Sequence, residues 1–403
     1  MTNTFNKRAF NRRLPSLTLP FFIASAVFTS TMGWAESSTS SLLLEEVVVT
    51  AQKRAENILE VPITIDNFSA DDISNTGALL ISDIDDYIPG FEANDTSVTQ
   101  NALTLRGVSS SNISIGGDPS VATFFDGMYM PQATAMVAFS DLARVEVLKG
   151  PQGTLYGRNA SAGVVNLIPN APAQEEEGFV AAKVGTDGLM RIEGMINTAL
   201  SDTVALRVNA LTNERDGYIQ NLAGEGDAGA EDNQALRVAV LWDASEKTSL
   251  QFAYDWDKVD NSARAAVGLS EFSYSQDPFA GKTENDLIDG GEGRDMQGFT
   301  MKLEHELNDQ WLMKASTSYR EWETYNREEE DGTSEISVYL DTNNQEDSDI
   351  FYNEVSFHFT NDRFDWVMGA NYSKEDVMQR TTLTLMADSI ARAATTEVEA
   401  FLE

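Results

Sequence analysis

The stretch RVEVLKGPQGTLYGRNASAGVVNLIP, Arg144 to Pro169, decides the fold of this chain. Its first residues mix apolar with charged side chains and predict a strand, which must end at Gly150-Pro151 because glycine permits and proline forces a turn. Further glycines predict a compact loop from which one aromatic and one basic side chain project. These loop residues are Gly153, Tyr156, Gly157, Arg158 and Gly163. The last piece, Gly163 to Ile168, predicts a buried strand.

The glycine spacing argues against a phosphate-binding loop, because neither GxxxxGK[ST] nor a GxGxxG that opens a helix is present. The string VEVLKGPQGTLYGRNASAGVVN instead resembles the end of the plug domain of TonB-dependent outer-membrane receptors. The resemblance continues upstream in VPITIDNFSADDI, YIPGF, LTLRGV and FFDGMYM. It implies an α+β plug domain followed by antiparallel transmembrane β-barrel strands. The residues that match the plug motif are Arg106, Gly107, Asp126, Gly127, Arg144, Glu146, Lys149, Gly150, Gly153, Tyr156, Gly157, Arg158 and Gly163.

The composition limits the kinds of function. Lysine and arginine total 28 against 64 aspartate and glutamate, a formal net charge of −36, which disfavours nucleic acid and favours cationic or metal-bearing ligands. There is no cysteine, and the two histidines, His305 and His358, do not form a metal-binding pair. No serine, histidine and carboxylate pattern indicates catalysis, so we predict that the chain is not an enzyme. We expect no resident cofactor or metal.

The N-terminus has the features of a secretory signal peptide over residues 1–35. A basic start is followed by a mostly apolar run, Leu14 to Phe28, and by small residues up to Ala35. A transmembrane anchor is the alternative, but prolines at 15 and 20 interrupt a run that is already short for a spanning helix. Since no other stretch is long and apolar enough, we expect the mature chain to enter a membrane only as β-structure.

A short segment of high β-propensity, EEVVVTA, follows the predicted signal peptide within residues 36–56. It is suited either to adding itself to the edge of another protein's sheet or to being an ordinary first strand of the next domain. It resembles the TonB box of the same receptors, which implies TonB and its inner-membrane energising complex as partners. The box residues are Glu45, Glu46, Val47, Val48, Val49, Thr50 and Ala51.

The pattern over residues 57–172 predicts a small α/β domain, which corresponds to the plug. We expect strands at 61–68, 102–107 and 123–129, a helix capped by Ser69 and Asp72, and a second helix over Ile81 to Tyr87. Loops 93–101 and 109–119 are rich in small polar residues and could simply be solvated connections. The resemblance places such loops at the extracellular apex, where the candidate ligand-binding residues are Asn94, Asp95, Ser109, Ser110, Asn112 and Asp118.

The composition changes at Ala171-Pro172-Ala173, and residues 173–403 alternate apolar with polar side chains, as in Leu236 to Asp243. A soluble β-sandwich also alternates, but its strands usually run about five or six residues. Here they run about ten, with aromatic residues near their ends, as lipid-facing strands require. We predict short turns at Asp187-Gly188 and near Ser245 on one side, and long acidic loops at 216–233, 260–294 and 324–349 on the other.

About ten strands are predicted from Gly178 to Glu403, whereas a plugged transporter barrel has about 22. We therefore expect a C-terminally truncated chain whose incomplete barrel forms a curved, open sheet beside the plug. The acidic run Glu328 to Asp331 lacks the ligand spacing of a calcium loop, so we expect it to be solvated. We expect Arg106, Arg144 and Arg158 either to pair with acids on the inner wall of the barrel or to be solvated.

These observations and the resemblance imply a receptor in the cell outer membrane for energised uptake of a scarce ligand. In the family this ligand is most often a ferric siderophore complex, and iron would then be carried as part of the ligand. Cobalamin, a glycan or another complex is the alternative, because such receptors share this plug. A passive porin or adhesin is a second alternative, but an open pore needs neither a box nor a plug.

Overall fold

The computed structural model describes residues 48–387 except 51–52, 55, 95–96, 98, 111, 113–116, 225, 276 and 278. All these residues lie within one compact unit, Val47–Glu403. The predicted signal peptide and the residues Glu45, Glu46, Val47, Ala51 and Asp95 are outside the described residues. Across the described ranges, the structure has no helix with the length and apolar character needed to span a membrane.

The plug domain contains a five-stranded sheet with the order β3(Thr64–Ser69), β8(Leu142–Lys149), β9(Gly163–Pro169), β6(Val121–Phe125) and β7(Met128–Met130). The pair β6 and β9 is parallel, and the other pairs are antiparallel. Apolar residues of the central strands are fully buried, among them Val145, Val147, Val164 and Val165. Burying such side chains contributes about 1.5–3 kcal/mol each. The stretch quoted first therefore forms the centre of the plug, as predicted.

Local sequence signals place the plug's helices. In α1(Ala70–Thr76), the Ser69 hydroxyl accepts from the amide of Asp72 at 3.2 Å, and the Asp72 carboxylate accepts from the amide of Ser69 at 2.9 Å. The predicted helix Ile81 to Tyr87 is the 3-10 helix η1(Ile81–Tyr87). A second 3-10 turn is η2(Gln132–Thr134), and β4(Phe91–Asn94) pairs with β5(Ala102–Leu105). Both predicted helices are confirmed.

The strand predicted at 123–129 is instead a hairpin. Strands β6 and β7 are joined by Asp126 and Gly127, which have φ of 54° and 82°. An Asp-Gly pair suits this turn because both positions need positive φ. Arg106 and Gly107 form a similar turn, with φ of 52° and 76°, so the strand predicted at 102–107 ends at Leu105.

Two glycines of the loop after β8 have structural reasons. The loop contains the one-turn helix α2(Gly153–Tyr156), which ends at Gly157 with φ of 82°. At Gly163, an added Cβ would lie 2.3 Å from both the Leu105 side chain and the Leu148 carbonyl oxygen. Only glycine therefore allows β9 to begin this close to β8 and β5.

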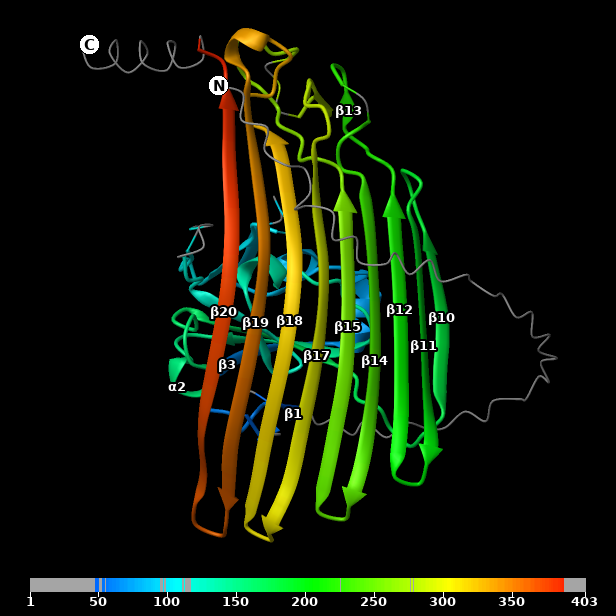
Figure 1. Cartoon of the computed structure of the whole chain (residues 1–403), viewed down its shortest axis with the longest axis vertical. Helices are drawn as coiled ribbons and strands as arrows, with labels where there is room; N and C mark the ends of the chain where they lie inside the picture. Colours follow the sequence, from blue (N-terminus) through cyan, green and yellow to red (C-terminus); the bar gives the residue numbers. More distant parts are fainter. Residues whose placement is uncertain are drawn as a thin grey trace, which may run out of the picture. The chain divides into compact units, whose positions relative to one another are not determined.

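Residues beyond the plug form a nine-stranded antiparallel sheet in chain order, apart from the short strands β13 and β16 (Figure 1). Its strands are β10(Glu177–Val184), β11(Met190–Ser201), β12(Val204–Arg215), β14(Glu231–Ser245), β15(Thr248–Asn261), β17(Gly291–Asn308), β18(Trp311–Glu329), β19(Leu340–Thr360) and β20(Asp365–Leu385). Among the described residues, β10 and β20 each pair on one side only, so the sheet is open there. The later strands are longer than the ten residues predicted, because their backbone pairing extends into the segments that were expected to be loops.

The two faces of this sheet differ in polarity. Large apolar side chains are exposed on one face, for example Phe299, Tyr319 and Phe351. The other face carries buried polar and charged side chains against the plug, including Arg207, Arg237, Asp257, Arg294 and Ser318. A soluble sandwich would bury its apolar face, so this arrangement supports the lipid-facing interpretation of the alternation.

The long connections lie at one end of the sheet and the short ones at the other, as predicted, except for the short turn between β10 and β11. Long connections follow β12, β15 and β18, and contain β13(Gln220–Asn221), β16(Lys282–Thr283) and η3(Ile336–Val338). The turn at Asp187-Gly188 was predicted among the short turns of the other end, and this is wrong. The amide of Asp216, at the start of a long connection, donates to the carbonyl of Asp187 at 2.8 Å. Because antiparallel strands alternate in direction, the turns after β10 and β12 must share one end.

Candidate functional site

The described end of the box segment docks against the plug. Strand β1(Val48–Val49) pairs antiparallel with β2(Glu56–Asn57). Val49 is fully buried in the same core as the plug strands, whereas Val48 is 43% exposed. Val49 therefore anchors the box segment in the plug core, and β2 pairs with it in a separate two-stranded sheet.

A buried carboxylate, Glu146 of β8, receives this segment. Its side chain accepts hydrogen bonds from the Thr50 amide at 2.8 Å, from the Thr50 hydroxyl at 3.1 Å and from Arg144 Nε at 2.8 Å. Asn166 Nδ2 donates to it at 3.5 Å. Glu146 is 0% exposed, so these donors supply the hydrogen bonds that water would otherwise make. Undocking Thr50 removes two of them.

Arg144 was expected to pair with the barrel wall or to be solvated, and it does neither. It forms an ion pair with Glu146 on its own strand at 2.8 Å. Residues two positions apart in a strand share one face of the sheet, which brings this pair together.

Tyr156 of the plug motif also contacts the box segment. Its hydroxyl donates to the Thr50 carbonyl oxygen at 3.4 Å, and its ring packs edge-on against Phe124 with centroids 5.1 Å apart. The Lys53 ammonium lies 4.8 Å from the Tyr156 ring centroid. Burial raises the pKa of Tyr156, so the phenol stays protonated and remains a donor.

Two basic residues after the box reach the large sheet. Lys53 pairs with Glu354 of β19 at 3.1 Å, and Arg54 lies 3.9 Å from Asp365 of β20. The same short segment thus contacts the plug core and the inner wall.

The hairpin turn at Asp126 makes a charged contact between the plug and the sheet. Arg237 of β14 donates to its carboxylate at 2.6 Å, and Lys302 of β17 forms a second ion pair with it. Arg237 also pairs with Asp255 at 2.5 Å. Burial alone would raise the pKa of Asp126, but Lys302 and Arg237 outweigh burial and lower this pKa.

Further ion pairs join the plug to the wall. Asp141 receives two bonds of 2.6 Å from Arg207 of β12. Arg158 pairs with Glu375 of β20 at 2.9 Å, which confirms the wall pairing expected for this arginine. Among the described residues, the other two basic residues of the plug motif form no ion pair with the sheet. Arg106 is exposed, and Lys149 pairs with Asp66 and donates to the Pro89 carbonyl oxygen within the plug.

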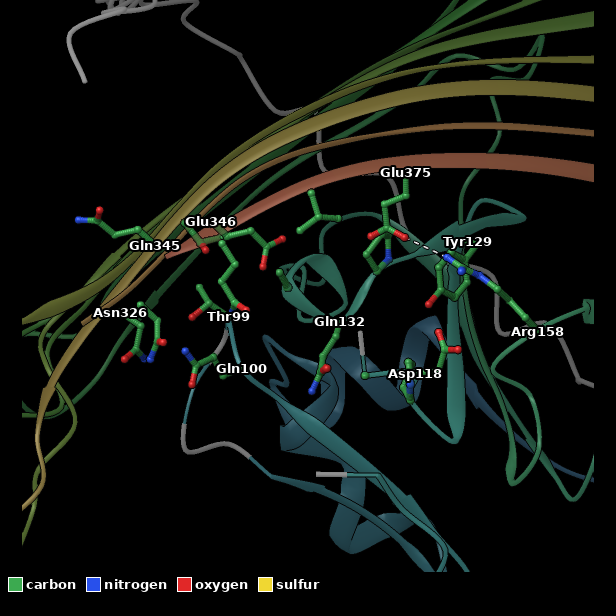
Figure 2. Close-up of a pocket in the computed structure, with 18 residues that line it drawn as sticks. Thr99, Gln100, Asp118, Tyr129, Gln132, Arg158, Asn326, Gln345, Glu346 and Glu375 are labelled. Atoms are coloured by element: carbon green, nitrogen blue, oxygen red, sulfur yellow. Dashed lines mark hydrogen bonds and ion pairs between the residues drawn. The ribbon is translucent and has the colours of Figure 1, made fainter. Parts of the chain in front are cut away.

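A cavity of about 100 Å³ lies between the plug and strands β18 to β20 (Figure 2). Its plug side includes Thr99, Gln100, Asp118, Tyr129, Gln132 and Arg158, and its sheet side includes Thr324, Asn326, Asn344, Gln345, Glu346, Glu375 and Gln379. The sheet residues belong to the halves of their strands nearer the long connections. The cavity therefore opens between the plug apex and the inner wall.

One of the predicted ligand-binding residues, Asp118, lines this cavity. Asn94 instead ends β4, and Ser109, Ser110 and Asn112 lie in the loop after β5, outside the cavity lining. The wall residues Glu346 and Glu375 were not singled out from the sequence. The alternation of their strands marks them as inward-facing, but it does not indicate which strands face the plug apex.

The plug's apical loop is anchored to the wall beside this cavity. Glu292 of β17 accepts from the amide and the hydroxyl of Thr99, both at 2.9 Å. Glu328 and Glu329, expected to be solvated, are buried instead. Glu328 accepts from Asn326 at 2.9 Å, and Glu329 accepts from the Thr333 amide at 3.1 Å. These hydrogen bonds replace hydrogen bonds to water and so allow both carboxylates to be buried.

The family model of the TonB-dependent receptor plug domain matches residues 57–164. The chain therefore contains a TonB-dependent receptor plug domain. The pesticin receptor of Yersinia pestis is 29% identical over 211 residues, which are 51% of this chain and 30% of that protein. The catecholate siderophore receptor Fiu of Escherichia coli K12 is 28% identical over 181 residues, 44% of this chain and 22% of that protein.

Solved structures support the same fold. The ferric yersiniabactin uptake receptor FyuA from Yersinia pestis superposes with a TM-score of 0.70 at 20% identity, over 80% of this chain and 50% of that one. The siderophore receptor PiuA from Acinetobacter baumannii gives a TM-score of 0.68 at 14% identity, over 87% and 52%. The chain thus spans less than a third of the curated relatives and about half of these structures. In this chain the plug domain is followed by a barrel-type antiparallel sheet.

Proposed function

We propose that this chain serves the energised uptake of a scarce ligand across the cell outer membrane, with a ferric siderophore complex as the cargo. The relatives named above include a ferric yersiniabactin uptake receptor and a catecholate siderophore receptor, which supports this cargo. The proposed activity is transport and not catalysis. It requires no resident cofactor, because iron would arrive and leave as part of the ligand.

The observation that carries the proposal is the contact between Thr50 and the buried Glu146. The partner is TonB, which would add a strand to the exposed edge of the box and pull. Any displacement of Thr50 withdraws donors from a carboxylate at the centre of the plug. Force on the box would therefore act directly on the plug core.

The proposal includes the organisation expected from the sequence. Residues 1–35 form a cleaved signal peptide, residues 36–56 a periplasmic segment, residues 57–172 the plug and residues 173–403 the N-terminal part of the barrel. The long connections then face the outside, and the box faces the periplasm.

The test compares Val48→Pro with Val48→Ile in cells that take up a labelled ferric siderophore. Val48 is 43% exposed, so neither side chain disturbs the core. Proline removes a backbone donor that an added strand needs, and isoleucine keeps it. We expect Val48→Pro to lose both uptake and capture of TonB, while binding of the ligand to the cell surface is kept. Equal uptake by the two variants would refute recognition by strand addition.

A further inference from the structure

The cavity between the plug apex and β18 to β20 is lined mainly by polar side chains, most of them carboxylates and amides (Figure 2). Three carboxylates belong to it, those of Asp118, Glu346 and Glu375, together with six side-chain amides. Arg158 is the one basic residue of the described lining. The charge balance of this cavity is therefore negative when its carboxylates are ionised.

The single guanidinium is already engaged by the protein. Arg158 Nη2 donates to Glu375 Oε2 at 2.9 Å, and the guanidinium carbon lies 5.5 Å from the centroid of the Tyr129 ring. Figure 2 shows Arg158 and Glu375 joined in this way beside Tyr129. Glu375 therefore offsets the charge of Arg158, which leaves this guanidinium a weaker site for an anionic ligand.

Two acceptor atoms on the opposite side receive no hydrogen bond from the described residues. Trp322 Nε1 and the Ser348 hydroxyl both donate to Glu346 Oε1, at 2.6 and 3.1 Å. Neither bond uses Glu346 Oε2. Asn326 is 2% exposed, and its Oδ1 has no hydrogen-bond partner among the described residues. A buried acceptor without a donor is costly, so a ligand that donates to it is favoured.

The surroundings of the cavity have the same sign of charge. The three long connections at this end of the sheet, residues 216–230, 262–290 and 330–339, contain many more acidic than basic residues. Clustered charge of one sign raises the local concentration of oppositely charged solutes and repels like-charged ones. Both the approach to the cavity and the binding within it therefore favour cationic over anionic ligands.

We infer that this cavity takes a ligand that carries hydrogen-bond donors and no net negative charge, and that it discriminates against polyanionic complexes. This inference rests on the proposed function, since it specifies the cargo that the apex admits. Glu346 and Asn326 are its specificity-determining residues, because they present acceptors that only a donor group satisfies.

The test measures binding of three ferric complexes to outer membranes that contain the chain. The probes are a ferric trihydroxamate with one free ammonium, the same complex with that amine acetylated, and a ferric tris-catecholate. The first is singly positive, the second uncharged and the third triply negative. We expect the ammonium form to bind roughly threefold to tenfold more tightly than the acetylated form, and the tris-catecholate to bind most weakly. Added salt should narrow the difference.

Variants assign the effect to the cavity. Glu346→Gln should remove most of the preference for the ammonium form. Asp202→Asn is the matched control, because Asp202 is exposed in the turn between β11 and β12 at the opposite end of the sheet. Tight binding of the tris-catecholate would overturn the inference and leave the proposed function standing. Failure of all three to bind would overturn both. The expected order without TonB-dependent uptake would uphold the inference and refute the proposed function.

Discussion

Replacing Glu146 by glutamine should release the N-terminal segment from the plug while the plug stays folded. Thr50 donates two hydrogen bonds to this carboxylate, at 2.8 and 3.1 Å. Hydrogen bonds to a charged acceptor contribute about 1.5–3 kcal/mol, against about 0.5–1.5 kcal/mol for a neutral one. The substitution therefore costs the docked segment about 2 kcal/mol over the two bonds. A change of this size increases the undocked population roughly thirtyfold.

A single spin label can report this release, because the chain contains no cysteine. The label is attached to Val48→Cys, a position that is 43% exposed in the docked state. In Glu146→Gln the spectrum should gain a mobile component that the parent lacks. Glu92→Gln, at an exposed acid of β4, is the matched control and should leave the spectrum unchanged.

Amide exchange in β8 and β9 separates local release from loss of the whole plug. Protection there should change little, since Val145, Val147 and Val164 keep their packing. An immobile label in Glu146→Gln would refute the reasoning. So would equal loss of protection at β1 and β9, because the segment and the core would then be one cooperative unit.

Three further predictions concern the plug and the faces of the sheet. Gly163→Ala should lower the free energy of unfolding of the plug by about 2 kcal/mol in a urea titration, because the added Cβ meets Leu148 and Leu105. Gly153→Ala, with open space around it, should leave this free energy unchanged, and equal effects of the two substitutions would refute the close approach of β9 to β8 and β5. Because the folded state lowers the pKa of Asp126, the stability contributed by this carboxylate is complete above about pH 4 and is lost as pH falls through the folded pKa. Asp126→Asn should therefore make the free energy of unfolding of the plug less dependent on pH in acid, and an unchanged pH dependence would contradict this. A membrane-impermeant thiol reagent should label Phe279→Cys in a long connection but not Trp366→Cys on the apolar face, and the reverse pattern would mean that the faces are misassigned.

Much of the fold could be predicted because its signals are local. Ser69 and Asp72 cap a helix from three residues apart, and Gly150-Pro151 ends β8 within its own stretch. The hairpin at Asp126-Gly127 was missed although its signal was present, because apolar residues on both sides gave one continuous run. A turn inside a buried hairpin lacks the polar flanks that usually mark one.

The candidate site depended on distant partners and could be predicted only in part. Arg158 and Glu375 are 217 positions apart, and alternation shows that both could face inward without showing that they meet. The burial of Glu146 was also hidden, because an acid between apolar residues of a strand is as typical of a solvated face. Two of the hydrogen bonds to Glu146 come from Thr50, 96 positions earlier, and no spacing rule links these two residues.

The strand order of the plug sheet has a mechanical consequence. The first plug strand along the chain, β3, is at the edge of its sheet and pairs only with β8, while the later strands β9 and β6 form a parallel pair deeper in the sheet. Tension applied from the N-terminus reaches β3 directly after β2. It would separate β3 from β8 one residue pair at a time, beginning at Thr64 and Lys149, before it reaches the pairing of β9 with β6. The order of the chain thus lets a pull peel one side of the plug while the side that carries Asp126 stays bound to the wall.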